Sequence, residues 1–131
     1  MGGFLAQREH PVVRVTPQIG KNRLVIEISG RPSQAELEPL EQDLKAAVSR
    51  LRVPFDVLSD VHDLESLDGV KLDGVVALGH LLKSTGVRRV VRVVGKSSSG
   101  AVHMERLARL IRHSAHLAFT REEAEAMLDR A

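Results

Sequence analysis

The strongest constraint on the fold is the regular alternation of strand-like and helix-like segments along the chain. Runs dense in β-branched residues alternate with stretches whose Leu, Val and Ala recur at three- and four-residue steps. The predicted order is β-β-α-β-α-β-α-β-α. Strands separated by helices favour right-handed crossovers and parallel pairing, whereas a short turn between the first two strands favours an antiparallel hairpin. We therefore expect an α/β fold, with a mixed β-sheet, an antiparallel opening hairpin and helices packed on the sheet.

The first hairpin and the helix after it are marked by their turn and capping residues. Residues 11–30 predict two strands joined by a Gly-Lys-Asn turn. The start of the following helix can be interpreted in two ways. Ser33 and Glu36 match a capping box, whereas Pro39 suits the first turn of a helix better than its interior. A kink, or a later start near Glu38, would reconcile the two signals.

The second half of the chain continues the alternation. We expect, in chain order, a short strand at 55–58, a helix at about 70–84, a strand at 87–94, a helix around 104–111, a strand at 117–119 and a final helix. Gly86 suits the left-handed position that would end the helix predicted at about 70–84. Thr120 and Glu123 form a capping box for the final helix. The arginines of the 87–94 strand should lie near its ends or at an edge, because the rest of the strand is apolar.

Length and composition favour one domain. The chain has 131 residues, of which 43% are hydrophobic, and this is enough for a single core. We expect a flexible N-terminal segment at 1–10 and one domain over 11–131. The sequence shows neither an apolar run of about 18–20 residues nor a basic, apolar leader, so we expect a cytoplasmic protein without a membrane span.

Composition also limits the chemistry that the chain can carry. There is no cysteine, so disulfides, thiolate metal sites and cysteine nucleophiles are excluded. The absence of Trp and Tyr leaves few side chains on which nucleic-acid bases could stack. We find no G-x-S-x-G, HExxH, dinucleotide-binding or kinase motif. We therefore expect no enzymatic activity, no cofactor, no metal site and no nucleic-acid partner.

Polar residues cluster in an acidic loop after the third predicted strand. The candidate partner-binding residues of this loop are Asp60, His62, Asp63, Ser66, Asp68 and Gly69. Carboxylates near a histidine can hold a metal or move protons. They can equally form a solvated loop in which Asp60 or Asp68 caps the next helix, or dock a partner. Because open α/β sheets bind ligands at the carboxyl ends of their strands, docking is the favoured functional interpretation.

Two further segments are candidates for anion or partner contacts. A Gly-Lys-Ser-Ser-Ser-Gly loop before a helix offers Lys96, Ser97, Ser98 and Ser99 to an anion, or a serine to phosphorylation, or simply an N-cap. The helix after it carries Arg106, Arg109 and Arg112. This basic face can be solvated, can meet an acidic protein surface such as a second copy, or can contact phosphates without reading sequence.

The order and spacing of the segments resemble the STAS superfamily, most closely its SpoIIAA-like branch, which includes anti-sigma-factor antagonists and STAS/Sec14-like proteins. The resemblance covers roughly residues 12–130. Three segments carry it: Phe-Asp-Val-Leu-Ser-Asp at 55–60, Asp-Gly-Val at 68–70, and the ending Phe-Thr-Arg-Glu-Glu-Ala-Glu-Ala-Met-Leu at 119–128. The first is similar to the family's third strand, the second to the start of the next helix, and the third to the last strand and helix.

The resemblance implies a docking function but departs from the family's phosphorylation switch. In the antagonists a serine at the start of the second helix is phosphorylated by the anti-sigma kinase. Aligning Asp68 on the family aspartate places Gly69 and Val70 where the hydroxyls would stand. We therefore expect a non-enzymatic, STAS-like regulatory module that docks a protein partner (a regulatory protein or a second copy, as in a homodimer) without this switch. The alternative is a carrier of a small apolar or lipidic ligand.

Overall fold

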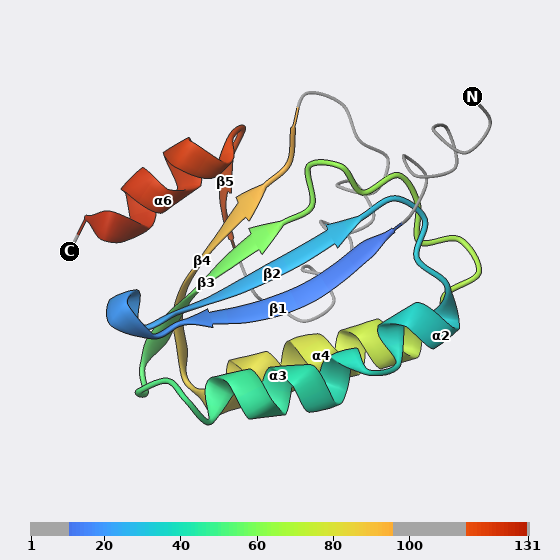
Figure 1. Cartoon of the computed structure of the whole chain (residues 1–131), viewed down its shortest axis with the longest axis horizontal. Coiled ribbons are helices and arrows are strands. Elements are labelled where there is room, and N and C mark those ends of the chain that lie inside the picture. Colours follow the sequence, from blue (N-terminus) through green and yellow to red (C-terminus); the bar gives the residue numbers. More distant parts are fainter. Residues whose placement is uncertain (1–10, 96–114, 131) are drawn as a thin grey trace.

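The computed structural model, which describes residues 11–95 and 115–130, is an α/β fold built on a five-stranded mixed sheet (Figure 1). The strands are β1 (Val12–Gln18), β2 (Arg23–Ser29), β3 (Phe55–Asp60), β4 (Val87–Val93) and β5 (His116–Ala118). They are ordered β1-β2-β3-β4-β5 in the sheet, with β1 antiparallel to β2 and every other pair parallel. The predicted mixed sheet with an antiparallel opening hairpin is confirmed.

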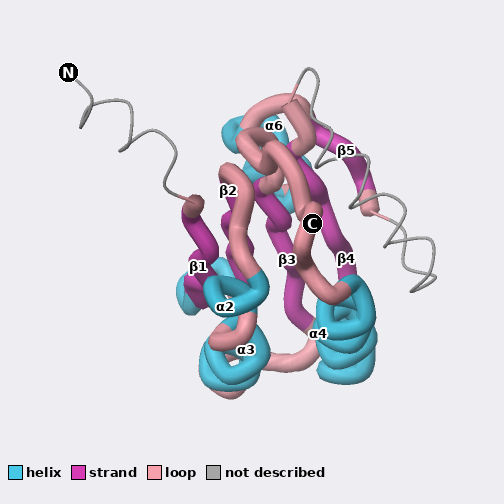
Figure 2. The backbone as a smooth tube through the Cα atoms, turned by 90° about the vertical axis from the view of Figure 1, so that its right-hand side faces the viewer, coloured by secondary structure: helices cyan, strands magenta, loops and turns pink. Residues whose placement is uncertain are grey.

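Helices cover both faces of the sheet. They are the 3-10 turn η1 (Ile19–Lys21), α2 (Gln34–Leu37), α3 (Leu40–Val48), α4 (Leu72–Thr85) and α6 (Arg121–Asp129). Figures 1 and 2 show α2, α3 and α4 on one side and α6 on the other. In the described ranges, no helix is both long and apolar enough to span a bilayer.

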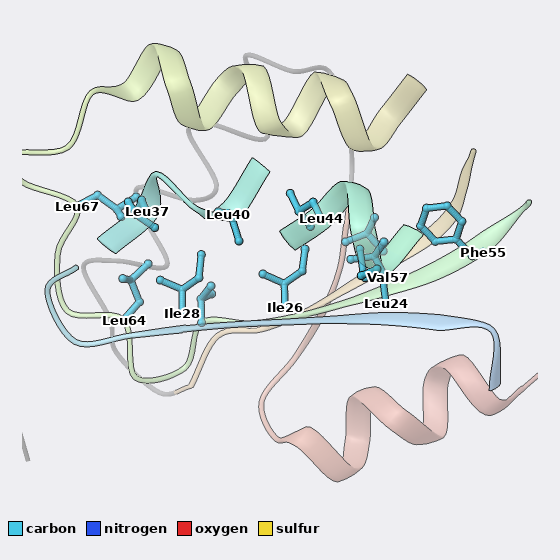
Figure 3. Packing of buried hydrophobic residues seen from close by; sticks show 13 residues of the cluster. Leu24, Ile26, Ile28, Leu37, Leu40, Leu44, Phe55, Val57, Leu64 and Leu67 are labelled. Atoms are coloured by element: carbon cyan, nitrogen blue, oxygen red, sulfur yellow. The ribbon is translucent and has the colours of Figure 1, made fainter. Parts of the chain in front are cut away.

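The larger part of the core lies between the sheet and α2–α4. Its buried side chains include Leu24, Ile26, Ile28, Leu37, Leu40, Leu44, Phe55 and Val57 (Figure 3). Alternate residues of β2 contribute to it, because successive side chains of a strand point to opposite faces. Val25 therefore lies on the α6 side, where it packs with Leu58, Val91 and Leu128. Burial on both faces explains the nearly continuous apolar runs of the central strands.

The chain after the hairpin forms two helices, because the capping box at Ser33 begins one helix and Pro39 precedes the start of another. The Ser33 hydroxyl accepts from the Glu36 N–H at 3.2 Å, and the Glu36 carboxylate accepts from the Ser33 N–H at 2.8 Å. This complete capping box begins α2. Pro39 has no N–H to continue the helical ladder, and α3 begins directly after it.

Several predicted boundaries shift by one or two residues. β3 extends through Ser59 and Asp60, which the sequence placed in the acidic loop, and α4 spans Leu72–Thr85. Gly86 adopts the predicted left-handed conformation, with φ +109°. The Thr120 hydroxyl caps α6 by accepting from the Glu123 N–H at 3.1 Å. The Glu123 carboxylate reaches the Phe119 N–H instead of closing the predicted capping box.

The predicted N-terminal segment at 1–10 and the predicted helix around 104–111 lie outside the described residues. The arginines of β4 lie near its ends. Arg88 and Arg89 are its second and third residues, and Arg92 is the last residue but one. Arg92 is nevertheless buried, which the sequence did not indicate.

Candidate functional site

The segment after β3, residues 61–71, is anchored in the core by its apolar side chains. Because Asp60 belongs to β3, the name acidic loop is used from here on for residues 61–71 alone. Val61, Leu64 and Leu67 are buried among the residues of the larger core cluster, and Leu64 is only 1% exposed. The sequence suggested a solvated loop with scattered apolar residues. The structure instead shows a loop whose every third residue is fixed in the protein interior.

Backbone hydrogen bonds fix the acidic loop to the end of β2. The Gly30 N–H donates to the Asp63 carbonyl at 2.9 Å, and the Glu65 N–H donates to the Gly30 carbonyl at 2.9 Å. On the other side, the Val61 N–H donates to the Val93 carbonyl at 3.0 Å. Gly30 has φ +71°, and a Cβ at this position would lie 3.1 Å from the Pro11 backbone. A side chain at position 30 would therefore disturb the attachment.

The charged residues of the acidic loop point to solvent. Asp63 has a 70% exposed side chain, and Glu65 and Asp68 are also exposed. Glu65 accepts from Arg31 at 3.2 Å, an exposed pair that contributes little stability. Gly69, also exposed, has φ +81°. Of the predicted docking residues, His62, Asp63, Asp68 and Gly69 are exposed on the segment that follows β3, Ser66 is half-buried, and Asp60 is buried in the strand.

The predicted capping role of Asp60 or Asp68 is wrong. The N-cap position of α4 is occupied by Lys71, which makes no side-chain cap. The Lys71 N–H instead donates to the Gln34 side chain of α2 at 2.9 Å. The Ser66 hydroxyl accepts from the Asp68 N–H at 2.9 Å, so this serine shapes the loop locally. Asp60 is held in β3, too far back along the chain to cap α4.

Asp60, the last residue of β3, and His62, in the acidic loop, form a hydrogen-bonded pair. The buried Asp60 carboxylate contacts His62 Nδ1 and also accepts from the His62 N–H at 3.2 Å. His62 Nε2 lies 3.0 Å from the Asp63 carboxylate. Both ring nitrogens therefore face carboxylates. This arrangement favours the protonated imidazolium, which can donate from both nitrogens.

A second set of charges completes the surroundings of Asp60. Arg121, at the start of α6, lies 3.7 Å from the carboxylates of both Asp60 and Glu27. Arg14 of β1 lies 3.9 Å from the other oxygen of Glu27. A shallow hollow beside His62 is lined by Arg14, Glu27 and Asp60 among others. Neither Glu27 nor Arg121 was predicted from the sequence, although a single acid within the apolar run of β2 is a signal for a charged partner.

The His62 pKa provides a direct test of this geometry. The hydrogen bond that His62 donates to Asp60 raises this pKa above the ordinary 6.5, and the charges of Asp60 and Asp63 raise it further. Burial and the charge of Arg121 lower it, but by less. We expect Asp60→Asn to lower the His62 pKa, as measured by NMR titration of the imidazole protons. Asp63→Asn should lower it less. A wild-type pKa at or below 6.5 would contradict the arrangement.

The shift has a defined consequence for stability. Because the folded-state pKa is raised, the contribution of protonated His62 is fully present below pH 6.5 and is lost as the pH rises through the folded-state value. The acidic loop should therefore be held most firmly at mildly acidic pH.

An apolar hollow adjoins the acidic loop on the helical side. We call it the α4 hollow. It has a volume of about 220 Å³ and lies between α2 and α4. Its lining includes the apolar side chains of Leu37, Val70, Val75 and Leu78. The exposed side chains of Glu38, Glu41 and Lys71 also line it, and Glu41 lies 3.6 Å from Lys45. The hollow itself therefore has two carboxylates and one ammonium group among its lining residues.

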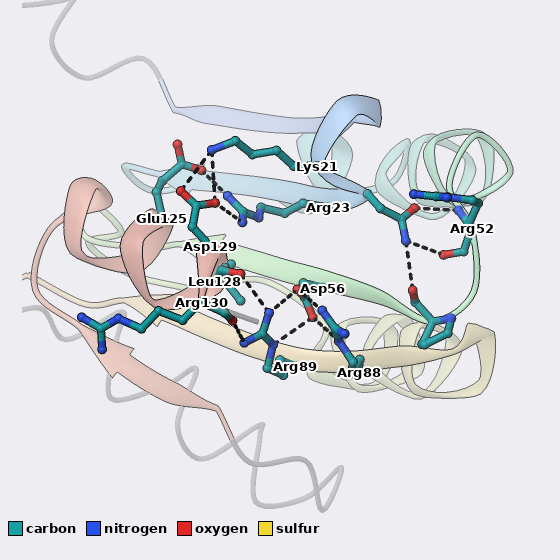
Figure 4. A network of polar contacts seen from close by, with 12 residues as sticks. Lys21, Arg23, Arg52, Asp56, Arg88, Arg89, Glu125, Leu128, Asp129 and Arg130 are labelled. Carbon is teal, nitrogen blue, oxygen red and sulfur yellow. Dashed lines mark hydrogen bonds and ion pairs between the residues drawn. The ribbon is translucent and has the colours of Figure 1, made fainter.

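The opposite end of the sheet holds a network of ion pairs (Figure 4). The buried Asp56 carboxylate accepts from Arg88 at 2.9 Å and 3.1 Å and from Arg89 at 2.8 Å and 3.2 Å. Nearby, the buried Arg23 donates to Glu125 and Asp129 of α6. The Asp56 pairs join β3 to β4, whereas the Arg23 pairs tie α6 to β2. None of these ion pairs was predicted from the sequence.

The other predicted contact residues cannot be placed with these two surfaces. Lys96, Ser97, Ser98 and Ser99, and the basic face of Arg106, Arg109 and Arg112, lie outside the described residues. Within the described ranges there is no group of three or more His, Asp or Glu side chains arranged to hold a metal ion.

Comparison of the chain with models of protein families, with curated proteins and with solved structures gives no match. The STAS-like assignment therefore stays a prediction from the sequence segments quoted above.

Proposed function

We propose that the chain is a non-enzymatic, STAS-like protein-interaction module that docks a regulatory partner through the acidic loop and the start of α4. The observation that carries the proposal is that the apolar side chains of the acidic loop are buried while its charged side chains are exposed. Leu64 and its apolar neighbours are fixed in the core, while Asp63, Glu65 and Asp68 face solvent. A loop held in this way loses little conformational entropy when it binds.

The charge of this surface indicates the kind of partner. Exposed carboxylates on the acidic loop continue to Glu38 and Glu41 at the rim of the α4 hollow, where Lys71 adds one positive charge. The surface would be complementary to a protein that presents basic residues around an apolar side chain. Gly69 and Val70 supply no hydroxyl at the start of α4, so docking would proceed without the family's phosphoserine.

Two features favour docking over the alternatives. His62 has a carboxylate at each ring nitrogen, which leaves neither nitrogen free to accept a proton as a general base. The α4 hollow opens to solvent. A second apolar hollow, between α3 and α4 and lined by Leu44, Val48 and Leu82 among others, also opens to solvent. A carrier of a lipidic ligand would be better served by an enclosed cavity.

Charge reversal of the acidic loop tests the proposal. We expect Asp63→Lys with Asp68→Lys to remove at least one protein that the wild-type chain captures from native lysate, because repulsion replaces attraction at the contact. The readout is quantitative mass spectrometry of captured proteins.

The matched control is Glu122→Lys, a reversal at an exposed position of α6 on the other face of the sheet. The control should retain the captured protein. Equal recovery by the loop variant and the wild type would contradict docking through the acidic loop.

A further inference from the structure

An exposed apolar residue flanked by arginines projects from the connection between α3 and β3. We call residues 50–54 the basic loop. Val53 is 66% exposed, and Arg50 and Arg52 are exposed beside it. Large aliphatic side chains gain free energy on burial, at about 25 cal/mol per Å² of apolar surface. A fixed, exposed valine between two cations is therefore suited to contact an apolar site with an acidic rim.

The basic loop is held in one conformation. The Asn22 side-chain amide donates to the carbonyls of Arg52 and Pro54, each at 3.0 Å, and its oxygen accepts from the Arg52 N–H at 2.7 Å (Figure 4). Val53 packs against Gly86, where an added Cβ would lie 2.4 Å from the Val53 side chain. Binding would therefore need little ordering of this loop.

The basic loop and the α4 hollow lie at different places along the helices. The hollow is lined by residues of α2 and of the N-terminal halves of α3 and α4, whereas the basic loop follows the end of α3 and contacts Gly86 at the end of α4. One copy cannot bring its own basic loop to its own hollow. Two copies arranged head to tail can, because each then presents one surface to the next.

We propose that a second copy of this chain docks here, with Val53 of one copy in the α4 hollow of the next. Arg50 and Arg52 would then face Glu38 and Glu41 at the rim. The inference rests on the proposed docking function and names its partner. A two-fold arrangement joining like ends would bring like charges together, which disfavours it relative to the head-to-tail contact.

Sedimentation velocity at low ionic strength tests the proposal. The weight-average sedimentation coefficient of the wild type should rise with protein concentration. It should fall in about 0.5 M salt, where exposed charges are screened within a few ångströms. Arg50→Glu with Arg52→Glu, and separately Glu38→Lys with Glu41→Lys, should each raise the apparent dissociation constant at least about tenfold.

Mixing the two double variants is the decisive experiment. Each retains one native surface, so an equimolar mixture can form the native contact between unlike molecules and should recover association. Val53→Asp should weaken association in the wild-type background, because it places a carboxylate in an apolar hollow beside acidic residues. Glu122→Lys reverses an exposed charge on the other face of the sheet and should leave association unchanged, and thermal unfolding should show that every variant is folded.

A wild-type chain that stays monomeric at every concentration, or a mixture that fails to associate, would overturn head-to-tail docking. Neither result would touch the proposed function, which fails only if reversal of Asp63 and Asp68 changes no captured protein. The two proposals can therefore fail separately.

Discussion

Replacing Asp56 by Ala should lower the free energy of unfolding by about 3 kcal/mol, measured by urea denaturation at neutral pH. The Asp56 side chain is 5% exposed and accepts hydrogen bonds from both Arg88 and Arg89. Without the carboxylate, two neighbouring guanidinium groups would repel each other, and the more buried of them, Arg89, would lose its ion pair.

Arg89 makes the effect larger than that of one ion pair. It also donates to the Leu128 carbonyl at 2.9 Å and the Arg130 carbonyl at 2.8 Å, at the end of α6. These carbonyls have no partner within the helix, so Arg89 supplies what a C-cap would supply. Asp56 positions Arg89 for these bonds, and its removal should loosen α6 as well as β4.

The pH dependence identifies the carboxylate as the cause. Burial alone would raise the pKa of Asp56, but the hydrogen bonds and charges of Arg88 and Arg89 outweigh it and lower the pKa from 3.8 to about 2. Because the folded-state pKa is depressed, the stabilisation is present above the unfolded-state value and is lost as the pH falls toward 2. The shift corresponds to about 2 kcal/mol. The difference between wild type and Asp56→Ala should therefore shrink between pH 5 and pH 2 by about that amount.

Asp68→Ala serves as the control, because this carboxylate is exposed on the acidic loop. It should change stability by no more than about 0.5 kcal/mol. A loss for Asp56→Ala that is equally small would show that the ion pairs of Asp56 add no stability. A larger loss that is the same at pH 2 and pH 7 would show that the charge of the carboxylate is not its cause.

The sequence predicts the elements well where a local signal has one physical meaning. Gly86 could end a helix in the left-handed conformation because it lacks a Cβ, and the structure shows it there. Ser33 and Pro39 gave two conflicting signals, and local reasoning could not show that both would be used. β3 ran two residues longer than predicted, because its pairing with β2 and β4 decides where a strand ends.

The sequence predicted which residues belong to the candidate site, but not which of their side chains contact one another. Position along the chain was enough to place Asp63 and Asp68 on the edge where the parallel strands end. It could not show that Asp60 turns to His62 and Arg121, because Arg121 is distant in sequence and arrives through the packing of α6. The α4 hollow also depends on two helices that meet only in the fold.

Replacing Leu64 by Ala should lower the free energy of unfolding by about 2–4 kcal/mol, because the variant leaves a void where a side chain was 1% exposed. Leu64 also pairs with Gly30 through an isolated parallel bridge, beside the hydrogen bonds that fix the acidic loop. We therefore expect the amide of Glu65, which donates to the Gly30 carbonyl, to exchange with solvent faster than global destabilisation alone would cause. Urea denaturation and amide hydrogen exchange provide the two measurements.

The comparison that isolates the loop is Leu44→Ala, a truncation of an equally buried leucine in α3. It should cost a similar free energy of unfolding while leaving the Glu65 amide protected relative to the remaining global stability. For a protein partner identified by capture, Leu64→Ala should weaken binding more than Leu44→Ala does, because a loosened acidic loop must be ordered again on binding. Equal exchange at Glu65 in the two variants would mean that Leu64 stabilises the core without fixing the docking surface, and the rigid presentation on which the proposed function depends would then be wrong.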